Sequence, residues 1–391
     1  MKNPILLLLA IIIFSSLLGP LSKLPLNLDP VNVYLSDIFV AVLPVYLILN
    51  WKKVSSLIIH DKPIKLLVIF IIFAFFTLFI SPIRLAWPER FVSLLYLLRF
   101  TAYAGIYPAV ILETYKNKKN KDKLMLYLNL SGIVLIATGW LQYFLYPDLR
   151  NLYYLGWDPH FKRIFALILD PNYLGLLLVF YFLLIHIKGK NQNRNLILKT
   201  LTLITLAFTY SRGSFLALLS SGIYYAYRIK KLFLYTGVGL ILLFSLVLLP
   251  RPGGVGVRLE RLFSVVERVE NWQYAAGITV KNPFFGIGFN TLRYAGKIYK
   301  NLPADWLTSH SAAGIDNSFL FVASTTGLIG LCLFLYFLVS LFSASGILGK
   351  SIIIATVVHS LFINSFFFIF VNIWFFTILA IDRKFDVKQS S

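Results

Sequence analysis

The chain has 391 residues, of which 58% are hydrophobic and 14% charged, and its formal net charge is +21. Several windows of 17 or more residues lack charge, which is typical of membrane spans and excludes an ordinary soluble protein. In a membrane protein most of the positive charge sets orientation, so no nucleic-acid partner is expected. The single cysteine, Cys332, excludes a disulfide framework and a cysteine metal site.

The apolar segments predict an all-α, polytopic membrane protein with about twelve transmembrane helices in one domain, residues 1–391. The expected spans are 3–19, 31–49, 64–81, 91–112, 123–145, 172–187, 196–210, 213–228, 232–249, 318–343, 351–368 and 369–381. The first resembles a signal peptide in length, but no small-residue cleavage site precedes Pro20, so we expect a retained span. The last is short for a bilayer unless it is tilted or partly buried.

The basic residues of the connections fall into two alternating sets. One set, which includes both chain ends, holds 21 Lys and Arg, of which 18 are Lys; the other holds 15, of which 10 are Arg. The positive-inside rule therefore predicts a protein of the cytoplasmic (inner) membrane with both termini in the cytoplasm. The opposite face is rich in Arg, the side chain suited to a bidentate grip on phosphate, which points to a phosphate-bearing substrate outside.

Arginines at the outer face are the candidate phosphate ligands. Arg212 lies in the hairpin YSRGS at 210–214, where the alternative is an interfacial side chain that reaches lipid phosphate. The long outer loop at 250–317, expected to contribute to the active site, is predicted helical at 257–280 and brings Arg261 and Arg268 to nearly the same face. Ordinary surface ion pairs are the alternative for these two. Arg163 is a further candidate.

Arg99 lies inside an apolar segment, and we expect it to pair with an intramembrane acid such as Asp37. Arg84 and Arg293 are expected to lie at the surface, without a role in the reaction.

The candidate catalytic residues His310, Asp316 and Asn317 cluster where the long loop re-enters the membrane. Partial desolvation there would raise the pKa of Asp316 toward useful base strength. The alternative is that Asp316 caps the following helix, with help from Asn317 or Ser318. His310 is equally compatible with a solvated loop histidine.

Other catalytic chemistries lack support in the sequence. HExxH, CxxC, GxSxG and Walker patterns do not occur, so no metal site and no cofactor is expected. The glycines Gly286 and Gly288 predict a tight turn in preference to a phosphate cradle.

Short motifs between residues 165 and 335 resemble the O-antigen ligase and polymerase superfamily of membrane glycosyltransferases. They are DPNYLG at 170–175, with Asp170 and Asn172, SRGS at 211–214, Arg268 followed by Trp272, NPFFGIG at 282–288, DNSFL at 316–320 and GLIG at 327–330. The resemblance implies a C-type glycosyltransferase of polysaccharide or lipopolysaccharide biosynthesis in the cell envelope. Its donor would be an undecaprenyl-diphosphate-linked glycan on the outer leaflet, and its acceptor a glycan or a lipid.

The resemblance also implies a departure from the ligases, which typically have His before the Asn where this chain has Asp316. An Asp-Asn pair is more similar to the polysaccharide polymerases, and His310 is then a second candidate base. We therefore expect an inverting, metal-independent polymerase, with a ligase that transfers glycan to lipid, sugar or protein as the alternative. A lipid-linked glycan transporter or flippase is the alternative of another class, although neither inverted repeats nor broken helices in matching halves are evident in the sequence.

Overall fold

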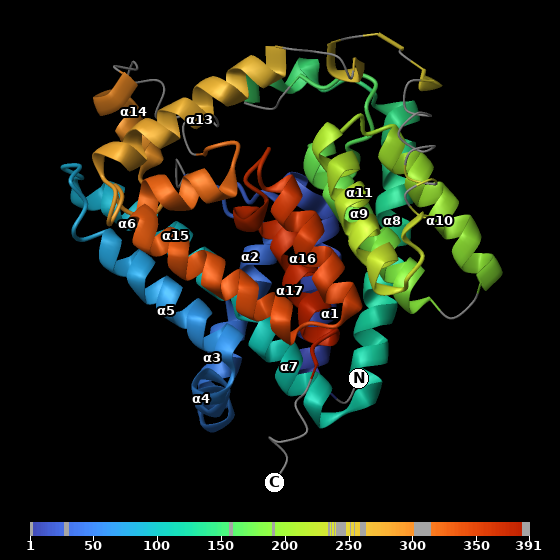
Figure 1. Ribbon diagram of the computed structural model, residues 1–391, viewed down its shortest axis with the longest axis horizontal. Helices are drawn as coiled ribbons and strands as arrows, with labels where there is room; N and C mark the ends of the chain where they lie inside the picture. Colours follow the sequence, from blue (N-terminus) through green and yellow to red (C-terminus); the bar gives the residue numbers. More distant parts are fainter. Residues whose placement is uncertain are drawn as a thin grey trace.

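The computed structural model describes residues 3–26, 31–155, 159–189, 192–233, 263–300 and 314–384, with a few positions between 235 and 258. Within these ranges the fold is all-helical and has no strand (Figure 1). The first half contains α1 (Pro4–Ser15), η1 (Ser16–Ser22), α2 (Leu35–Val40), α3 (Val42–Leu49), α4 (Trp51–His60), α5 (Lys62–Thr77), α6 (Trp87–Ala104), α7 (Ile106–Lys116), α8 (Lys118–Leu145), η2 (Arg150–Leu155) and η3 (Ala166–Ile168). The second contains α9 (Pro171–Lys188), α10 (Gln192–Ala207), α11 (Arg212–Arg228), η5 (Val255–Val257), α13 (Phe263–Lys281), α14 (Leu292–Lys300), α15 (Ser318–Ala344), α16 (Ile347–His359), η8 (Ser365–Phe367) and α17 (Ile369–Ile381).

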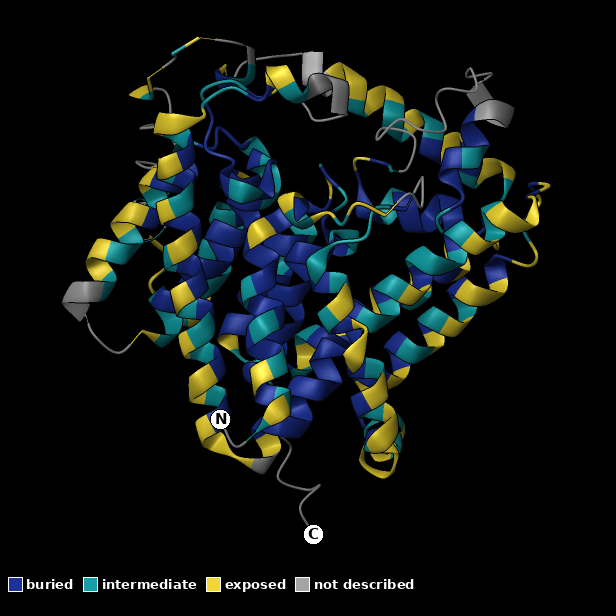
Figure 2. Cartoon of the chain, turned by 180° about the vertical axis from the view of Figure 1, so that it is seen from behind, coloured by how far each residue is buried: buried dark blue, intermediate teal, exposed yellow. Residues whose placement is uncertain are grey.

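The core of the bundle is formed by helices that are apolar on every side. Every residue of α17 is buried, as are most residues of α9, and both lie among the other helices (Figures 1 and 2). At thirteen residues each, α16 and α17 are too short for a straight crossing of the bilayer. Longer helices enclose α16 and α17, so the surfaces of these two short helices face mainly protein instead of lipid, and they need not span the whole bilayer.

Five helices in the described part are long and apolar enough to cross a membrane: Pro4–Ser22, Trp87–Tyr115, Lys118–Leu145, Pro171–Lys188 and Ser318–Ala344. The pair 35–49 and 51–60, bent by 88°, would give a sixth. Shorter apolar helices at 195–207, 347–359 and 369–381 account for other predicted spans. These helices indicate a multi-pass membrane protein. The count of twelve spans stays a prediction, and the span expected at 232–249 lies largely outside the described residues.

Segments from the Lys-rich connections meet at one end of the bundle, here called the Lys-rich end. Asn3 donates to the Glu113 carboxylate at 2.6 Å, and Lys188 pairs with Asp382 at 2.8 Å. Arg383 pairs with Asp61, the N-cap of α5. Figure 1 shows α4 at this end and α13 and α14 across the opposite one, which we call the outer end.

The predicted pairing of Arg99 with Asp37 is confirmed. The Arg99 guanidinium donates to Asp37 Oδ2 at 2.6 Å, and both side chains are about 15% exposed. Tyr103 donates to the other carboxylate oxygen at 3.0 Å. Two charges taken from water here satisfy one another, which makes Arg99 a structural link between α2 and α6.

The helix α15 is broken at Gly327, where φ is +69° and ψ −176°. The segment 282–288 fills the break: Ile287 and Gly288 donate backbone N–H groups to Ser324 O and Thr325 O at 3.0 and 2.9 Å, and Leu328 N donates to Pro283 O at 2.7 Å. This break was not anticipated from the sequence. The break is tolerated because the segment satisfies the backbone groups that it frees.

Candidate functional site

Three helices begin at the outer end, each with a side-chain cap from one of the sequence motifs. Asp170 Oδ1 accepts from the backbone N–H groups of Asn172 and Tyr173 at the start of α9. Ser211 caps α11, and Asn317 caps α15 by accepting from two N–H groups at 2.8 and 3.0 Å. Ser, Asp and Asn are preferred caps because their oxygens satisfy N–H groups that lack intrahelical partners.

The capping role expected for Asp316 thus belongs to its neighbour Asn317. Both ends of the Asn317 amide are engaged, since Nδ2 also donates to Leu361 O at 3.2 Å. The side chain is only 7% exposed. These contacts favour a structural role for Asn317 over the catalytic one predicted for it.

The motifs at 170–175 and 211–214 are joined by a buried hydrogen-bonded chain. Ser211 Oγ donates to Asn172 Oδ1 at 3.2 Å, and Ser214 Oγ donates to Asn172 O at 3.1 Å. His359, fully buried at the end of α16, lies 3.2 Å from Ser214 Oγ through Nε2 and 2.7 Å from Ser365 Oγ through Nδ1. These hydrogen bonds fix the start of α11, and with it the backbone of Arg212. Sequence reasoning missed His359, since a lone histidine in an apolar segment carries no pattern.

One face of α13 holds the segment before α15. Arg268, Asn271 and Trp272 are three and four residues apart and therefore share that face. Arg268 Nε lies 3.9 Å from Asp316 Oδ2, Asn271 Oδ1 accepts from Asp316 N at 3.0 Å, and Trp272 Nε1 donates to Asp316 O at 3.1 Å. The candidate base and a candidate phosphate ligand, 48 positions apart in the sequence, are thus brought side by side.

Arg212, between the predicted spans 196–210 and 213–228, lies close enough to Arg268 for the two charges to interact. Partial burial lowers the pKa of Arg212, and the positive charge of Arg268 lowers it further. Like charges disfavour one another, so a shared anion would stabilise both. This interaction is consistent with the prediction that Arg212 and Arg268 bind one anion.

Arg163 is placed differently from the prediction of a diphosphate ligand. Its side chain is 3% exposed, and Nε donates to Thr209 O at 2.8 Å while NH1 lies 3.4 Å from His160 Nδ1. A guanidinium bound to the backbone just before Ser211 supports the hairpin, and we assign it a positioning role. The remaining predicted residues, Arg261 and His310, lie outside the described residues.

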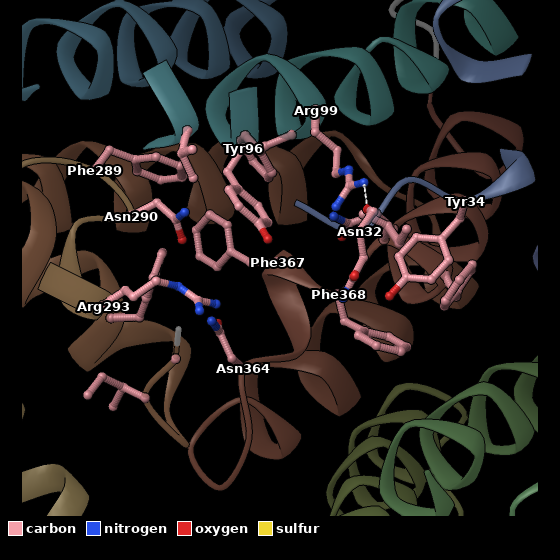
Figure 3. Close-up of a pocket in the computed structure, with 18 of the residues that line it drawn as sticks. Asn32, Tyr34, Tyr96, Arg99, Phe289, Asn290, Arg293, Asn364, Phe367 and Phe368 are labelled. Atoms are coloured by element: carbon pink, nitrogen blue, oxygen red, sulfur yellow. Dashed lines mark hydrogen bonds between the residues drawn. The ribbon is translucent and has the colours of Figure 1, made fainter. Parts of the chain in front are cut away.

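A cavity of about 930 Å³ opens beside Asp316 and Asn271. Figure 3 shows side chains from several elements pointing into it, among them Tyr96 and Arg99 of α6, Arg293 of α14 and Phe367 of η8. Arg293, expected at the surface, is only 8% exposed and lines the cavity. That expectation was wrong because the second residue of α14 faces the bundle.

The turn at 282–288 does not cradle phosphate. Gly286 and Gly288 have φ of +65° and +98°, and the amides of Ile287 and Gly288 are committed to α15 carbonyl groups. A tight turn was the expected form. Among the residues that the structure describes, no group of three or more His, Cys, Asp and Glu side chains is placed to hold a metal ion.

A known family matches the part of the chain that holds all of these motifs except the one at 170–175. Residues 197–335 match the family model Wzy_C, described as O-antigen ligase, so the match runs from α10 through α11, α13 and α14 to the first two thirds of α15. No curated protein matches the sequence significantly. The resemblance found in the motifs is confirmed over this range. Over residues 197–335 the chain is therefore similar to the O-antigen ligase family, which supports the resemblance to the O-antigen ligase and polymerase superfamily.

Proposed function

We propose that the protein is an inverting, metal-independent glycosyltransferase that polymerises or ligates undecaprenyl-diphosphate-linked glycan at the outer face of the cytoplasmic membrane. The observation that carries the proposal is the 3.9 Å approach of Arg268 to Asp316 on the wall of a cavity lined by polar and aromatic side chains, with Arg212 near enough for Arg268 to affect its pKa. A base for the acceptor and cations for the leaving group are both needed, and three separate motifs supply them.

In the reaction an acceptor hydroxyl attacks the anomeric carbon of the donor sugar from the face opposite the diphosphate. The carbon–oxygen bond to phosphate breaks, and the lipid diphosphate leaves with the electron pair. Asp316 or His310 takes the hydroxyl proton, a contribution of about 10² to 10⁴ in rate. Arg212 and Arg268 stabilise the charge that develops on the diphosphate, a role that divalent metals fill elsewhere.

An apolar groove supports the proposal of a polyprenyl-linked donor, because it could hold an isoprenoid tail. It has a volume of about 510 Å³ and is lined by residues of α9, α10 and α11, including Leu206, Phe208, Phe215 and Leu218. Phe215 lies three residues after Arg212, within one helical turn. An isoprenoid tail in the groove would therefore place its diphosphate near Arg212.

Transport of a lipid-linked glycan is the rival activity, and the break in α15 invites comparison with the broken helices of transporters. In transporters such breaks line the substrate cavity. Here the freed backbone groups at Ser324 and Thr325 bond to Ile287 and Gly288 instead. The geometry therefore favours an enzyme, and the Asp316–Asn317 pair favours a polymerase over a ligase.

The test is transfer by the purified protein in lipid nanodiscs from an undecaprenyl-diphosphate-linked oligosaccharide. A ladder of longer lipid-linked products is expected of a polymerase, and a single product on an added acceptor is expected of a ligase. Activity should survive EDTA, and added magnesium should be dispensable. Movement of the donor between leaflets without a new glycosidic bond would support transport instead, and loss of transfer on chelation with recovery on adding a divalent ion would reject the metal-free mechanism.

The proposed orientation has a separate test. In a Cys332→Ala background, cysteine at position 256 should react with an impermeant maleimide in intact cells, whereas cysteine at 118 should react only after permeabilisation. Labelling at 118 but not at 256 would reverse the orientation.

A further inference from the structure

The cavity beside Asp316 has the wall chemistry of a carbohydrate site. Aromatic rings, which offer flat apolar faces, include Tyr34, Tyr96, Phe289, Phe367 and Phe368. Side-chain amides, each with two donors and one acceptor oxygen, come from Asn32, Asn271, Asn290, Asn364 and Asn372. Figure 3 shows Asn290, Asn364 and Asn32 around the same space as Tyr96 and Phe367. A sugar ring presents apolar C–H faces and hydroxyl groups at its edge, so this alternation of rings and amides fits it, whereas a lipid tail would leave the amides without partners.

Charges of both signs line the cavity. Lys23, Arg99 and Arg293 are positive, and Glu89 and Asp316 are negative. Glu89 is engaged in capping α6, where its carboxylate accepts from Ala86 N at 2.7 Å.

The two arginines differ in how their charge is balanced. The Arg99 charge is matched by Asp37 at 2.6 Å, so it contributes hydrogen-bond donors more than net charge. Arg293 points into the cavity next to Asn364 (Figure 3). A guanidinium has five N–H donors in a fixed fork, so Arg293 can keep its contacts with the protein and still bind a carboxylate with two parallel hydrogen bonds.

We propose that this cavity binds an acidic sugar residue of the acceptor glycan, with the sugar carboxylate on the Arg293 guanidinium and the ring against Tyr96 and Phe367. The assignment to the acceptor rests on the proposed glycan transfer. Asp316 forms part of the cavity wall, while Arg268, the proposed diphosphate ligand, reaches Asp316 from α13 and does not line the cavity. A sugar in the cavity is thus on the side of the base from which the attacking hydroxyl comes.

The experiment measures binding without any donor, so that it is independent of transfer. The probes are methyl β-glucuronide and its neutral counterpart methyl β-glucoside, titrated against the full-length protein in nanodiscs with ligand-observed NMR. We expect the glucuronide to bind about 10-fold tighter, since the probes differ only at C6, where the glucuronide carboxylate can make a bidentate, charge-assisted contact that the glucoside hydroxymethyl group cannot. Equal affinities for the two sugars in the unmodified protein would overturn the proposal.

Arg293→Gln should remove the preference while leaving glucoside binding intact, which also reports that the variant is folded. Arg293→Lys keeps the charge without the fork and should retain only part of the preference. If Arg293→Gln binds neither sugar, the test rests on Arg293→Lys, in which the preference for the glucuronide should be partly lost. The matched control is Arg84→Gln, an exposed arginine outside the cavity, which should behave as the unmodified protein.

An unchanged preference in Arg293→Gln, or in Arg293→Lys where that variant decides, would overturn the role of Arg293. Discrimination between the sugars in a protein that shows no transfer would leave the binding site in place and reject the proposed function. Transfer without discrimination between the two sugars would support the proposed function and reject the acidic-sugar site.

Discussion

Replacement of Asp316 by Asn separates a catalytic carboxylate from a simple partner of Arg268. The Asp316 side chain is 52% exposed and its carboxylate lies 3.9 Å from Arg268 Nε. An ion pair with that exposure is worth about 0.2–1 kcal/mol, so its loss alone would change the rate by no more than about 5-fold. A positioned general base contributes about 10² to 10⁴. The two roles therefore differ by more than an order of magnitude in the expected effect.

The assay is the initial rate of transfer from lipid-linked donor in nanodiscs at equal protein levels, with kcat/KM compared between variants. Asp316→Asn should lose at least about 10²-fold, and Asp316→Glu should recover part of the rate because it restores the carboxylate. Glu270→Gln is the matched control, since Glu270 is an exposed acid on the same helix as Arg268. A loss below about 5-fold in Asp316→Asn would refute the assignment of Asp316 as base and leave His310 as the candidate.

Three further outcomes follow from the geometry. Arg212→Lys and Arg268→Lys should each lower transfer by about 10²-fold, and the double variant should cost less in free energy than the sum of the two, because groups that hold one anion act as a unit. Arg99→Gln should destabilise the protein by about 3–5 kcal/mol by leaving Asp37 buried without its cation, seen as a lower unfolding temperature in detergent, and adding Asp37→Asn should recover part of the loss. Gly286→Ala should cost about 2 kcal/mol or more, because its φ is +65° and a Cβ would lie 2.5 Å from a backbone carbon of α15.

The arginine and glycine substitutions have matched controls in the chain. Arg84→Lys changes an exposed arginine and should leave transfer unchanged. Gly222→Ala places a methyl group where nothing lies within 4 Å and should be neutral or slightly stabilising. Additive losses at Arg212 and Arg268 would separate them into two sites, and an unfolding temperature of Gly286→Ala equal to that of the unmodified protein would contradict the close packing at the break.

Much of the helical architecture was predictable because hydropathy and charge act locally. The predicted span 172–187 differs from α9 by one residue at each end, and the predicted span 318–343 differs from α15 by one residue at its C-terminal end only. The break at Gly327 was not predictable, since the residues that satisfy it lie about 40 positions earlier in the chain. The 88° bend before α4 was missed for a similar reason: the apolar run ends at Leu49, and the direction of the following polar helix depends on packing.

The candidate site was predictable where residue chemistry is distinctive and not where it depends on which face is buried. Arg268 and Asp316 were both candidates from their residue type and motif, and the structure places them 3.9 Å apart. Arg163 and Arg293 reverse their expected roles: the first is buried against backbone, and the second, taken for a surface residue, lines the cavity. Both reversals arise because a sequence shows that an arginine is present but not what its side chain contacts.

The insertion of residues 282–288 into the break of α15 can affect the rate of transfer, because it sets the orientation of α13. The helix α13 runs directly into this joint, and Arg268 lies 14 residues from Asn282, or about 21 Å along the helix axis. A rotation of α13 by about 5° at the joint would displace the guanidinium by roughly 2 Å, and a misplacement of about 1 Å can cost 10²-fold in rate. Substitutions at this joint should therefore alter turnover by changing the orientation of α13 and the position of Arg268, although the substituted residues contact neither substrate.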